Sequence, residues 1–344
     1  MTVRFPFPSY PSGWYRVSSS KDLMPGKRRT VHYFGRDMVL FRAKSGGVSV
    51  FDAYCPHMGA HLGLGRVRED NLECAFHGWK FDATGSCVEV PGGRRIPPKA
   101  KLRTWPAREV NGQILVYHHP EGEPPSWEVP EFPESSDPQW TGFGRGQRWE
   151  IRTTPQELAE NGVDMTHFSY LHHKQFRFNE SLSVETDGPF FIHRTFQSFN
   201  VFQLARKLVG AEIAGPLDVH MYGLGVVCNR ISVDAKVRLS YTYVFYLTPV
   251  EPEVLEMTGV ISVKRSSGRL FTYFLGRKGM HEGNRTLKED KRILDSKIHL
   301  PRPHLAEGDG PIMRFRRWAG QFYTGEESPG RRGTQDTATP VAGT

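Results

Sequence analysis

Short runs of alternating apolar and polar residues occupy both halves of the chain. In the first 120 residues they are separated by turn-forming pairs such as Pro25-Gly26, Gly46-Gly47 and Asn111-Gly112. Alternation with a period of two is typical of half-buried strands, and an Asn-Gly pair beside an apolar run is typical of a tight hairpin. The strands predicted here are 14–17, 30–34, 38–42, 48–52 and 113–117. We therefore expect a small antiparallel β-domain.

A second group of alternating runs predicts another antiparallel sheet, with strands at 226–233, 237–247, 254–264 and 270–275. Two helices are expected beside it. The first begins at Thr154-Pro155-Gln156-Glu157, a capping box with proline at the first helical position, and continues toward His173. The second is expected over 284–300, with Asn284 as its N-cap. The predicted fold class is α+β.

Changes in composition divide the chain into four predicted segments. Residues 1–120 form the first β-domain. Residues 121–153, rich in Pro and Glu at first, form a linker and the start of the second domain, which occupies 154–323. The last segment, 324–344, contains few apolar residues and is expected to be disordered.

Four residues form the pattern C-x-H-x16-C-x2-H: Cys55, His57, Cys74 and His77. Each half of the pattern offers one sulfur and one nitrogen ligand. Structural zinc sites usually repeat pairs of the same ligand type, whereas a Rieske [2Fe–2S] cluster is held by two cysteines on one iron and two histidines on the other. The pattern therefore favours a Rieske cluster over zinc.

A second pattern, D-x2-H-x4-H, contains Asp164, His167 and His172. Histidines five residues apart do not share a face of a regular helix, so the helix must end, unwind or bulge between them if both bind one metal. Two imidazoles and a carboxylate are the ligand set of non-haem Fe(II) oxygenases. Surface or capping histidines are the alternative interpretation.

The composition of the chain limits which partners and which cellular location are expected. The net charge is +8, but the basic residues are spread along the chain and no nucleic-acid motif occurs, so an acidic redox partner is favoured over nucleic acid. No apolar run is long enough to span a membrane, and no secretory signal precedes Tyr10. Only four cysteines occur, two of them in the first motif, which indicates a reducing compartment. A cytoplasmic location is expected, and peripheral membrane association is compatible with it.

The two patterns together, with residues 53–63 and 76–82 around the first, resemble the catalytic subunit of Rieske non-haem iron oxygenases. The resemblance implies an N-terminal Rieske domain and a C-terminal helix-grip-like catalytic domain. It places Cys55 and Cys74 on one cluster iron and His57 and His77 on the other. Ala75 departs from the family, which usually has proline there.

The same resemblance assigns the second centre. Asn161 begins the family pattern N-x2-D-x2-H-x4-H, in which His167 and His172 would bind a mononuclear Fe(II). Asp164 would connect an iron-binding histidine to a cluster histidine of a neighbouring subunit. The third ligand is expected at Asp290, where the family places an aspartate on a late helix. Asp295 and Glu289 are alternatives, and a solvent-exposed helix acid is the non-functional interpretation of all three.

Further similarity indicates the branch of the family. Residues 96–97, 105–106, 111–117, 309–312 and 316–323 are similar to those of cholesterol 7-desaturases, 3-ketosteroid 9α-hydroxylases and bacterial sterol demethylases, and the resemblance covers about residues 10–323. It implies a monooxygenase that hydroxylates, desaturates or demethylates a sterol or steroid ring. O2 and NAD(P)H electrons, delivered by a ferredoxin or a flavin-containing reductase, would be required, and a homotrimer is implied. The animal desaturases begin with a membrane segment that is not seen here, which favours a bacterial enzyme.

Two alternatives remain at this point. A Rieske oxygenase could act on another hydrophobic or aromatic substrate. A Rieske electron-transfer protein without oxygenase activity would need only the first third of the chain. Respiratory Rieske domains also carry two additional cysteines, at positions occupied here by Ala60 and Phe76.

Overall fold

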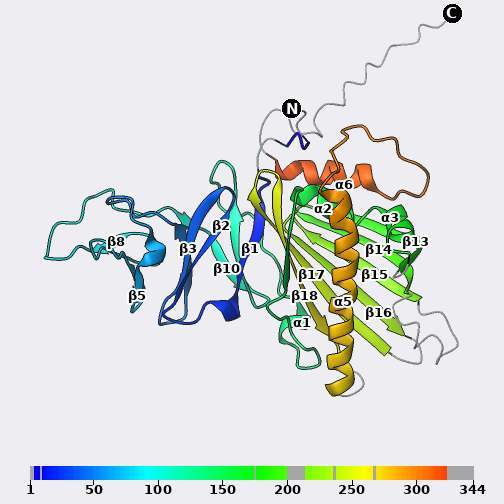
Figure 1. The fold of residues 1–344 in the computed structure, drawn as a ribbon, viewed down its shortest axis with the longest axis horizontal. Coiled ribbons are helices and arrows are strands. Elements are labelled where there is room, and N and C mark those ends of the chain that lie inside the picture. The colour runs from blue at the N-terminus through cyan, green and yellow to red at the C-terminus, as the bar shows by residue number, and fades with distance from the viewer. Residues whose placement is uncertain are drawn as a thin grey trace, which may run out of the picture.

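The computed structural model describes residues 4–7, 10–173, 176–199, 214–234, 238–265 and 269–323. The predicted disordered tail, 324–344, and the first residue of the predicted strand 237–247 lie outside these ranges. Figure 1 shows the small N-terminal sheets at one end of the molecule and one large sheet, crossed by a long helix, at the other. Among the described residues, no helix combines the length and apolar character needed to cross a bilayer.

Three small antiparallel sheets form the N-terminal half. The first has the order β1 (Gly13–Ser19), β11 (Gln113–His118), β10 (Ala107–Val110). The second has the order β2 (Arg28–Tyr33), β3 (Arg36–Arg42), β4 (Val48–Asp52), β9 (Thr104–Trp105). The third has the order β5 (Arg66–Arg68), β6 (Asn71–Glu73), β7 (Lys80–Phe81), β8 (Cys87–Glu89). The short helices η1 (Ser20–Asp22) and η2 (Leu62–Leu64) connect strands. These bounds confirm the five predicted N-terminal strands.

The hairpin predicted at Asn111-Gly112 is present. Val110 pairs with Gln113, so the loop between β10 and β11 contains only Asn111 and Gly112. Asn111 and Gly112 have φ angles of 55° and 71°. A two-residue turn with positive φ at both positions matches the right-handed twist of the flanking strands, which explains the choice of Asn and Gly.

A seven-stranded antiparallel sheet forms most of the second half. Its strand order is β12 (Gln147–Ile151), β18 (Val254–Val263), β17 (Arg238–Glu251), β16 (Val226–Asp234), β15 (Ala214–Tyr222), β14 (Phe190–Phe199), β13 (Phe176–Asp187). The described helices are α1 (Pro133–Ser136), α2 (Pro155–Glu160), α3 (Met165–Tyr170), α5 (Arg269–Leu294) and α6 (Ile312–Ala319), followed by η3 (Gly320–Phe322). The long helix α5 crosses one face of the sheet (Figure 1). Buried apolar side chains of the sheet, α2, α5 and α6 form one core.

Helix α5 corrects two predictions. Residues 270–275 are helical and not a strand, and the helix expected over 284–300 begins at Arg269 and ends at Leu294. A short apolar run does not distinguish a strand from a buried helix by its periodicity, and the glycines at 276, 279 and 283 lower intrinsic helix propensity. The helix forms because it packs on the sheet: a Cβ at Gly279 or Gly283 would lie within 3 Å of Ile261 or Tyr243.

Candidate metal centres

The two halves of the first motif lie in turns of the same shape, which we call the ligand loops (55–59 and 74–78). One follows β4, and the other joins β6 to β7. In each, the amide four residues after the cysteine donates to the cysteine carbonyl, from Gly59 to Cys55 at 2.9 Å and from Gly78 to Cys74 at 3.1 Å. Both glycines have φ near +70°, a region that glycine adopts at little cost. Local sequence therefore determines both turns.

The four motif side chains converge from these loops. Cys55 and Cys74 are buried and unpaired by disulfides, whereas His57 and His77 are exposed. The two imidazole ring centres lie 4.6 Å apart. Burial raises the pKa of the Cys55 thiol to about 11, and the neighbouring Cys74 adds to this effect. Two buried cysteine sulfurs and two histidines at the surface fit the donor set of a Rieske [2Fe–2S] cluster.

The single helix expected after Thr154 is two short helices. The Thr154 hydroxyl accepts a hydrogen bond from the Glu157 amide at 3.4 Å and caps α2. The chain then turns, and the Asp164 carboxylate accepts from the His167 amide at 3.2 Å and caps α3. Helix α3 ends at Tyr170, before His172. Of the three predicted possibilities between His167 and His172, a helix end, unwinding or a bulge, the structure shows a helix end.

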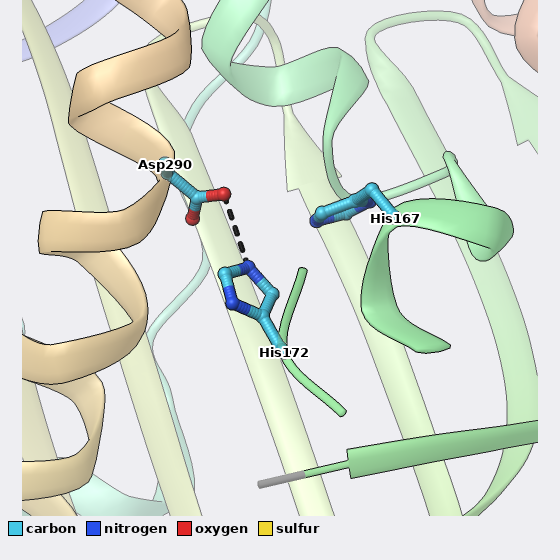
Figure 2. Close-up of side chains that lie close together, drawn as sticks. All are labelled: His167, His172 and Asp290. Atoms are coloured by element: carbon cyan, nitrogen blue, oxygen red, sulfur yellow. Dashed lines mark hydrogen bonds and ion pairs between the residues drawn. The ribbon is translucent and has the colours of Figure 1, made fainter. Parts of the chain in front are cut away.

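Figure 2 shows three side chains from separate elements pointing toward one another: His167 from α3, His172 from the segment after it, and Asp290 from α5. One candidate ligand atom from each lies within 4.8 Å of the others. His172 is fully buried, Asp290 is 9% exposed and His167 is half-buried. Two nitrogens and one carboxylate that converge with this spacing fit a single metal ion of the non-haem Fe(II) type.

Hydrogen bonds orient both imidazoles. His167 Nδ1 lies 2.6 Å from the Asp164 carbonyl oxygen, to which it can donate. His172 Nδ1 lies 2.9 Å from Glu289 Oε2, and its Nε2 lies 3.0 Å from Asp290 Oδ1. Burial disfavours the charged imidazole, but the two carboxylates outweigh burial and raise the pKa of His172. Nδ1 bonds of this kind leave Nε2 to face a metal.

The three candidate acids on α5 have different surroundings. Asp290 faces His172 Nε2 and belongs to the three-residue cluster. Glu289 contacts the opposite nitrogen of the same ring and lies 3.7 Å from Arg285. Asp295 accepts from the Arg152 amide at 2.8 Å and pairs with Lys291. Sequence reasoning did not find the contact of Glu289 with His172, because no motif links residues 117 positions apart.

The two centres lie far apart within one chain. Figure 1 shows β5, which lies between the two ligand loops in sequence, and β8, which follows them, at one end of the molecule and α3 at the other. Asp164 lies beside His167, whose hydrogen bonds and charge lower the carboxyl pKa although burial acts in the opposite direction. Asn161 follows α2 and lines the cavity beside His167.

A cavity with a volume of about 1220 Å³, including its open mouth, extends from the three-residue cluster along α5. Its lining is mostly apolar, with Leu217, Ile231, Phe245 and Met257 from the sheet and Leu287 from α5. Two polar lining residues, Asn229 and Tyr243, were missed in the sequence, where they are ordinary positions in alternating strands.

Comparison with known proteins gives two family matches. Residues 13–106 match the Rieske [2Fe-2S] domain, and residues 116–323 match the 3-Ketosteroid 9alpha-hydroxylase C-terminal domain. Cholesterol 7-desaturase nvd 1 of Ciona intestinalis is 35% identical, over 94% of this chain and 70% of that protein. The oxygenase component of a Rhodococcus rhodochrous 3-ketosteroid-9-alpha-monooxygenase is 28% identical, over 92% of this chain and 82% of that protein. Dicamba monooxygenase bound to 3,6-dichlorosalicylic acid has a similar fold, with a TM-score of 0.72, 20% identity and coverage of 90% and 96% of the two chains.

Proposed function

The chain belongs to the Rieske oxygenases that carry a 3-ketosteroid 9alpha-hydroxylase C-terminal domain, and from this premise we propose that it oxidises a sterol or steroid ring with O2. The proposal covers hydroxylation, desaturation and oxidative demethylation. One observation carries it: His167, His172 and Asp290 converge at the wall of an apolar cavity. The named relatives act on cholesterol or 3-ketosteroids, which are long apolar molecules of the kind such a cavity accommodates.

We assign two resident metal groups to this chain. The ligand loops would hold the Rieske cluster through Cys55, Cys74, His57 and His77, and His167, His172 and Asp290 would hold a mononuclear Fe(II). When bound, these groups supply single electrons and the activation of O2.

The protein contributes placement and exclusion of water. Glu289 and the Asp164 carbonyl fix the two imidazole rings from their Nδ1 atoms, so that both Nε2 atoms stay available. The apolar lining holds the substrate beside the three ligands and keeps bulk water away from the reacting carbon. Asn161 lines the cavity next to His167, and we propose that it helps to position the substrate or O2 there.

We also propose that electrons pass between subunits of a homotrimer. Within one chain the ligand loops and α3 lie at opposite ends of the molecule (Figure 1). We therefore propose that the mononuclear site receives its electrons from the ligand loops of a neighbouring subunit. Asp164 would join the two centres at that junction. A separate ferredoxin or flavin-containing reductase would supply electrons from NAD(P)H, since the 3-ketosteroid-9-alpha-monooxygenase relative is named as an oxygenase component.

Iron content and one variant test the proposal. Protein purified without oxygen should contain about three iron atoms per chain, two in the cluster and one mononuclear. His172→Ala should lose one of them, keep the visible spectrum of the cluster, and lose substrate-dependent NADH consumption with a panel of sterols and steroids. An electron-transfer protein would contain two irons and show no such consumption. Turnover that survives His172→Ala would contradict the assigned site, and turnover only of aromatic compounds would contradict the substrate class.

A further inference from the structure

Two residues of the cavity lining, Tyr243 and Asn229, each carry a buried polar atom without a hydrogen-bond partner among the described residues. The hydroxyl of Tyr243 and the side-chain oxygen of Asn229 are both covered from bulk water, and neither has a partner in the part of the chain that the structure describes. Both residues line the cavity, and Tyr243 is only 5% exposed. Buried polar groups are nearly always paired, because an unpaired one has lost its hydrogen bonds to water without replacement. An unpaired group in a ligand cavity points to a partner on the ligand.

These two residues form one polar station. Asn229 on β16 and Tyr243 on β17 are directly opposite each other in the strand register. Opposite residues of an antiparallel pair point to the same face of the sheet, with their Cβ atoms about 5 Å apart. An oxygen substituent that reaches one of them is therefore close to the other.

Two glycines leave space for the Tyr243 ring between the sheet and α5. The ring stacks on Phe245 with centroids 4.4 Å apart. A Cβ at Gly259 of β18 or Gly283 of α5 would lie within 3.0 Å of the tyrosine hydroxyl or ring. Both glycines thus make room for a tyrosine between the sheet and the helix, where a phenylalanine would pack without an unpaired hydroxyl.

The polar station of Tyr243 and Asn229 is separated from the metal-binding residues along α5. Gly283, which contacts Tyr243, precedes Asp290 by seven positions on α5, or about 10 Å along the helix axis. Gly279, Gly283, Thr286 and Asp290 line the cavity on one helix face. A ligand that reaches both ends must therefore be elongated, with its oxygen remote from the carbon that is oxidised.

We propose that Tyr243 and Asn229 bind an alcohol oxygen at one end of the sterol ring system and thereby determine which carbon lies beside Asp290. This inference rests on the sterol substrate class proposed above. The Tyr243 hydroxyl donates to the substrate oxygen, and the Asn229 side-chain oxygen accepts the substrate O–H. An alcohol satisfies both groups, a ketone satisfies only Tyr243, and a hydrocarbon satisfies neither. Sites built to bind a hydroxyl discriminate strongly against analogues that lack it.

Three matched probes test the proposal: cholestanol, cholestanone and cholestane, which differ only in one oxygen function. Their dissociation constants for the iron-loaded protein would be measured without oxygen, by partition from cyclodextrin. We expect cholestanol to bind at least about tenfold more tightly than cholestane. Tyr243→Phe should reduce that ratio about tenfold by weakening cholestanol alone. Asn229→Leu should weaken cholestanol and leave cholestanone unchanged.

Tyr246→Phe is the matched control, because Tyr246 is buried on the opposite face of the same strand and lies outside the cavity lining. It should leave all three constants unchanged. Tyr243→Phe with an unchanged ratio and a higher unfolding temperature would assign the hydroxyl a structural cost only and overturn the proposal. Equal binding of all three probes would overturn it while keeping the sterol class, whereas binding of none would overturn the sterol class and this inference together.

Discussion

At the scale of single residues, the role of a carboxylate depends on the groups that it contacts. Glu289 contacts His172, a proposed metal ligand, whereas Glu134 of α1 is 4% exposed and accepts hydrogen bonds from Arg230 and Thr242 of the sheet. A carboxylate beside a ligand histidine tunes metal affinity, but one paired with arginine contributes to folding stability. Substitution at each position should therefore give a distinct result.

Removal of the Glu289 acceptor should weaken retention of the mononuclear iron. Glu289→Leu leaves His172 Nδ1 without its 2.9 Å partner, and loss of such a partner typically costs about 10–100-fold in metal affinity. Glu289→Gln keeps an oxygen acceptor and should retain most of the iron. The measurement is iron per chain after dialysis against a chelator, with the visible cluster spectrum as the control. Full iron retention in Glu289→Leu would argue against this role.

Glu134 should make the stability of the protein dependent on acid pH. Burial tends to raise its pKa, but hydrogen bonds from Arg230 at 2.7 Å and Thr242 at 2.8 Å outweigh burial and lower the pKa. A group whose pKa is lower in the folded state stabilises the protein above its unfolded pKa, and this contribution disappears as the pH falls through the folded pKa. Glu134→Gln should cost about 1.5–3 kcal/mol at neutral pH and reduce the loss of stability on acidification below about pH 4.

Thermal unfolding of both proteins across that pH range measures this effect. Glu185→Gln is the control, because Glu185 pairs with Arg194 on the exposed surface and such pairs contribute about 0–1 kcal/mol. If the two variants had the same unfolding profile, the buried pair would not be a source of the acid sensitivity.

At the scale of elements, helix α5 connects the metal-binding cluster to the cavity wall. Its glycines are unfavourable for an isolated helix, yet two of them lie against sheet side chains where a Cβ would not fit. The third, Gly276, has room for a methyl group, because within the described part of the chain a Cβ there would meet only Val263, at 3.7 Å. Helix propensity and packing therefore act in opposite directions at Gly283 but not at Gly276.

The same substitution should have opposite effects at these two positions. Gly276→Ala should stabilise the protein by up to about 1 kcal/mol without a change in kcat/KM. Gly283→Ala brings a Cβ to 2.9 Å from Tyr243, and overpacking of this kind typically costs about 1–3 kcal/mol. It should also lower kcat/KM because the cavity wall moves. Unfolding temperature and steady-state kinetics measure both effects, and a stabilised, fully active Gly283→Ala would show that the contact can relax.

At the scale of the whole molecule, the ligand loops and the mononuclear site of one subunit lie at opposite ends of the folded molecule (Figure 1). Electron transfer between subunits makes a prediction that transfer within a chain does not. A chain with Cys55→Ser lacks the cluster, and a chain with His172→Ala lacks the mononuclear site, so each alone should be inactive. Co-expressed as mixed trimers, they should recover up to about a quarter of wild-type turnover, since a site needs its own iron and an intact neighbouring cluster.

Turnover of the co-expressed pair, compared with that of each variant alone, measures this recovery, and sedimentation establishes the oligomeric state. Mixing the two purified proteins without subunit exchange is the control and should give no activity. No recovery in proven mixed trimers would place both centres of a working pair on the same chain.

The sequence alone determined the features that depend on neighbours along the chain. The Cys-x-His and Cys-x2-His turns end in Gly59 and Gly78, the Asn111-Gly112 hairpin has the expected conformation, and Thr154 caps a helix. In each case the chemistry and spacing of a few consecutive residues restrict the backbone to one arrangement, and the family resemblance followed from these same motifs.

Only the tertiary structure decided how distant parts meet. Asp290 lies 118 residues after His172, and adjacent acids on a helix point about 100° apart, so the direction in which α5 packs determines whether Glu289 or Asp290 faces Nε2. The same packing made a helix of the predicted strand 270–275 and placed Asn229 and Tyr243 in the cavity. Sequence spacing cannot supply this information, because contacts between distant residues depend on how whole elements fit together.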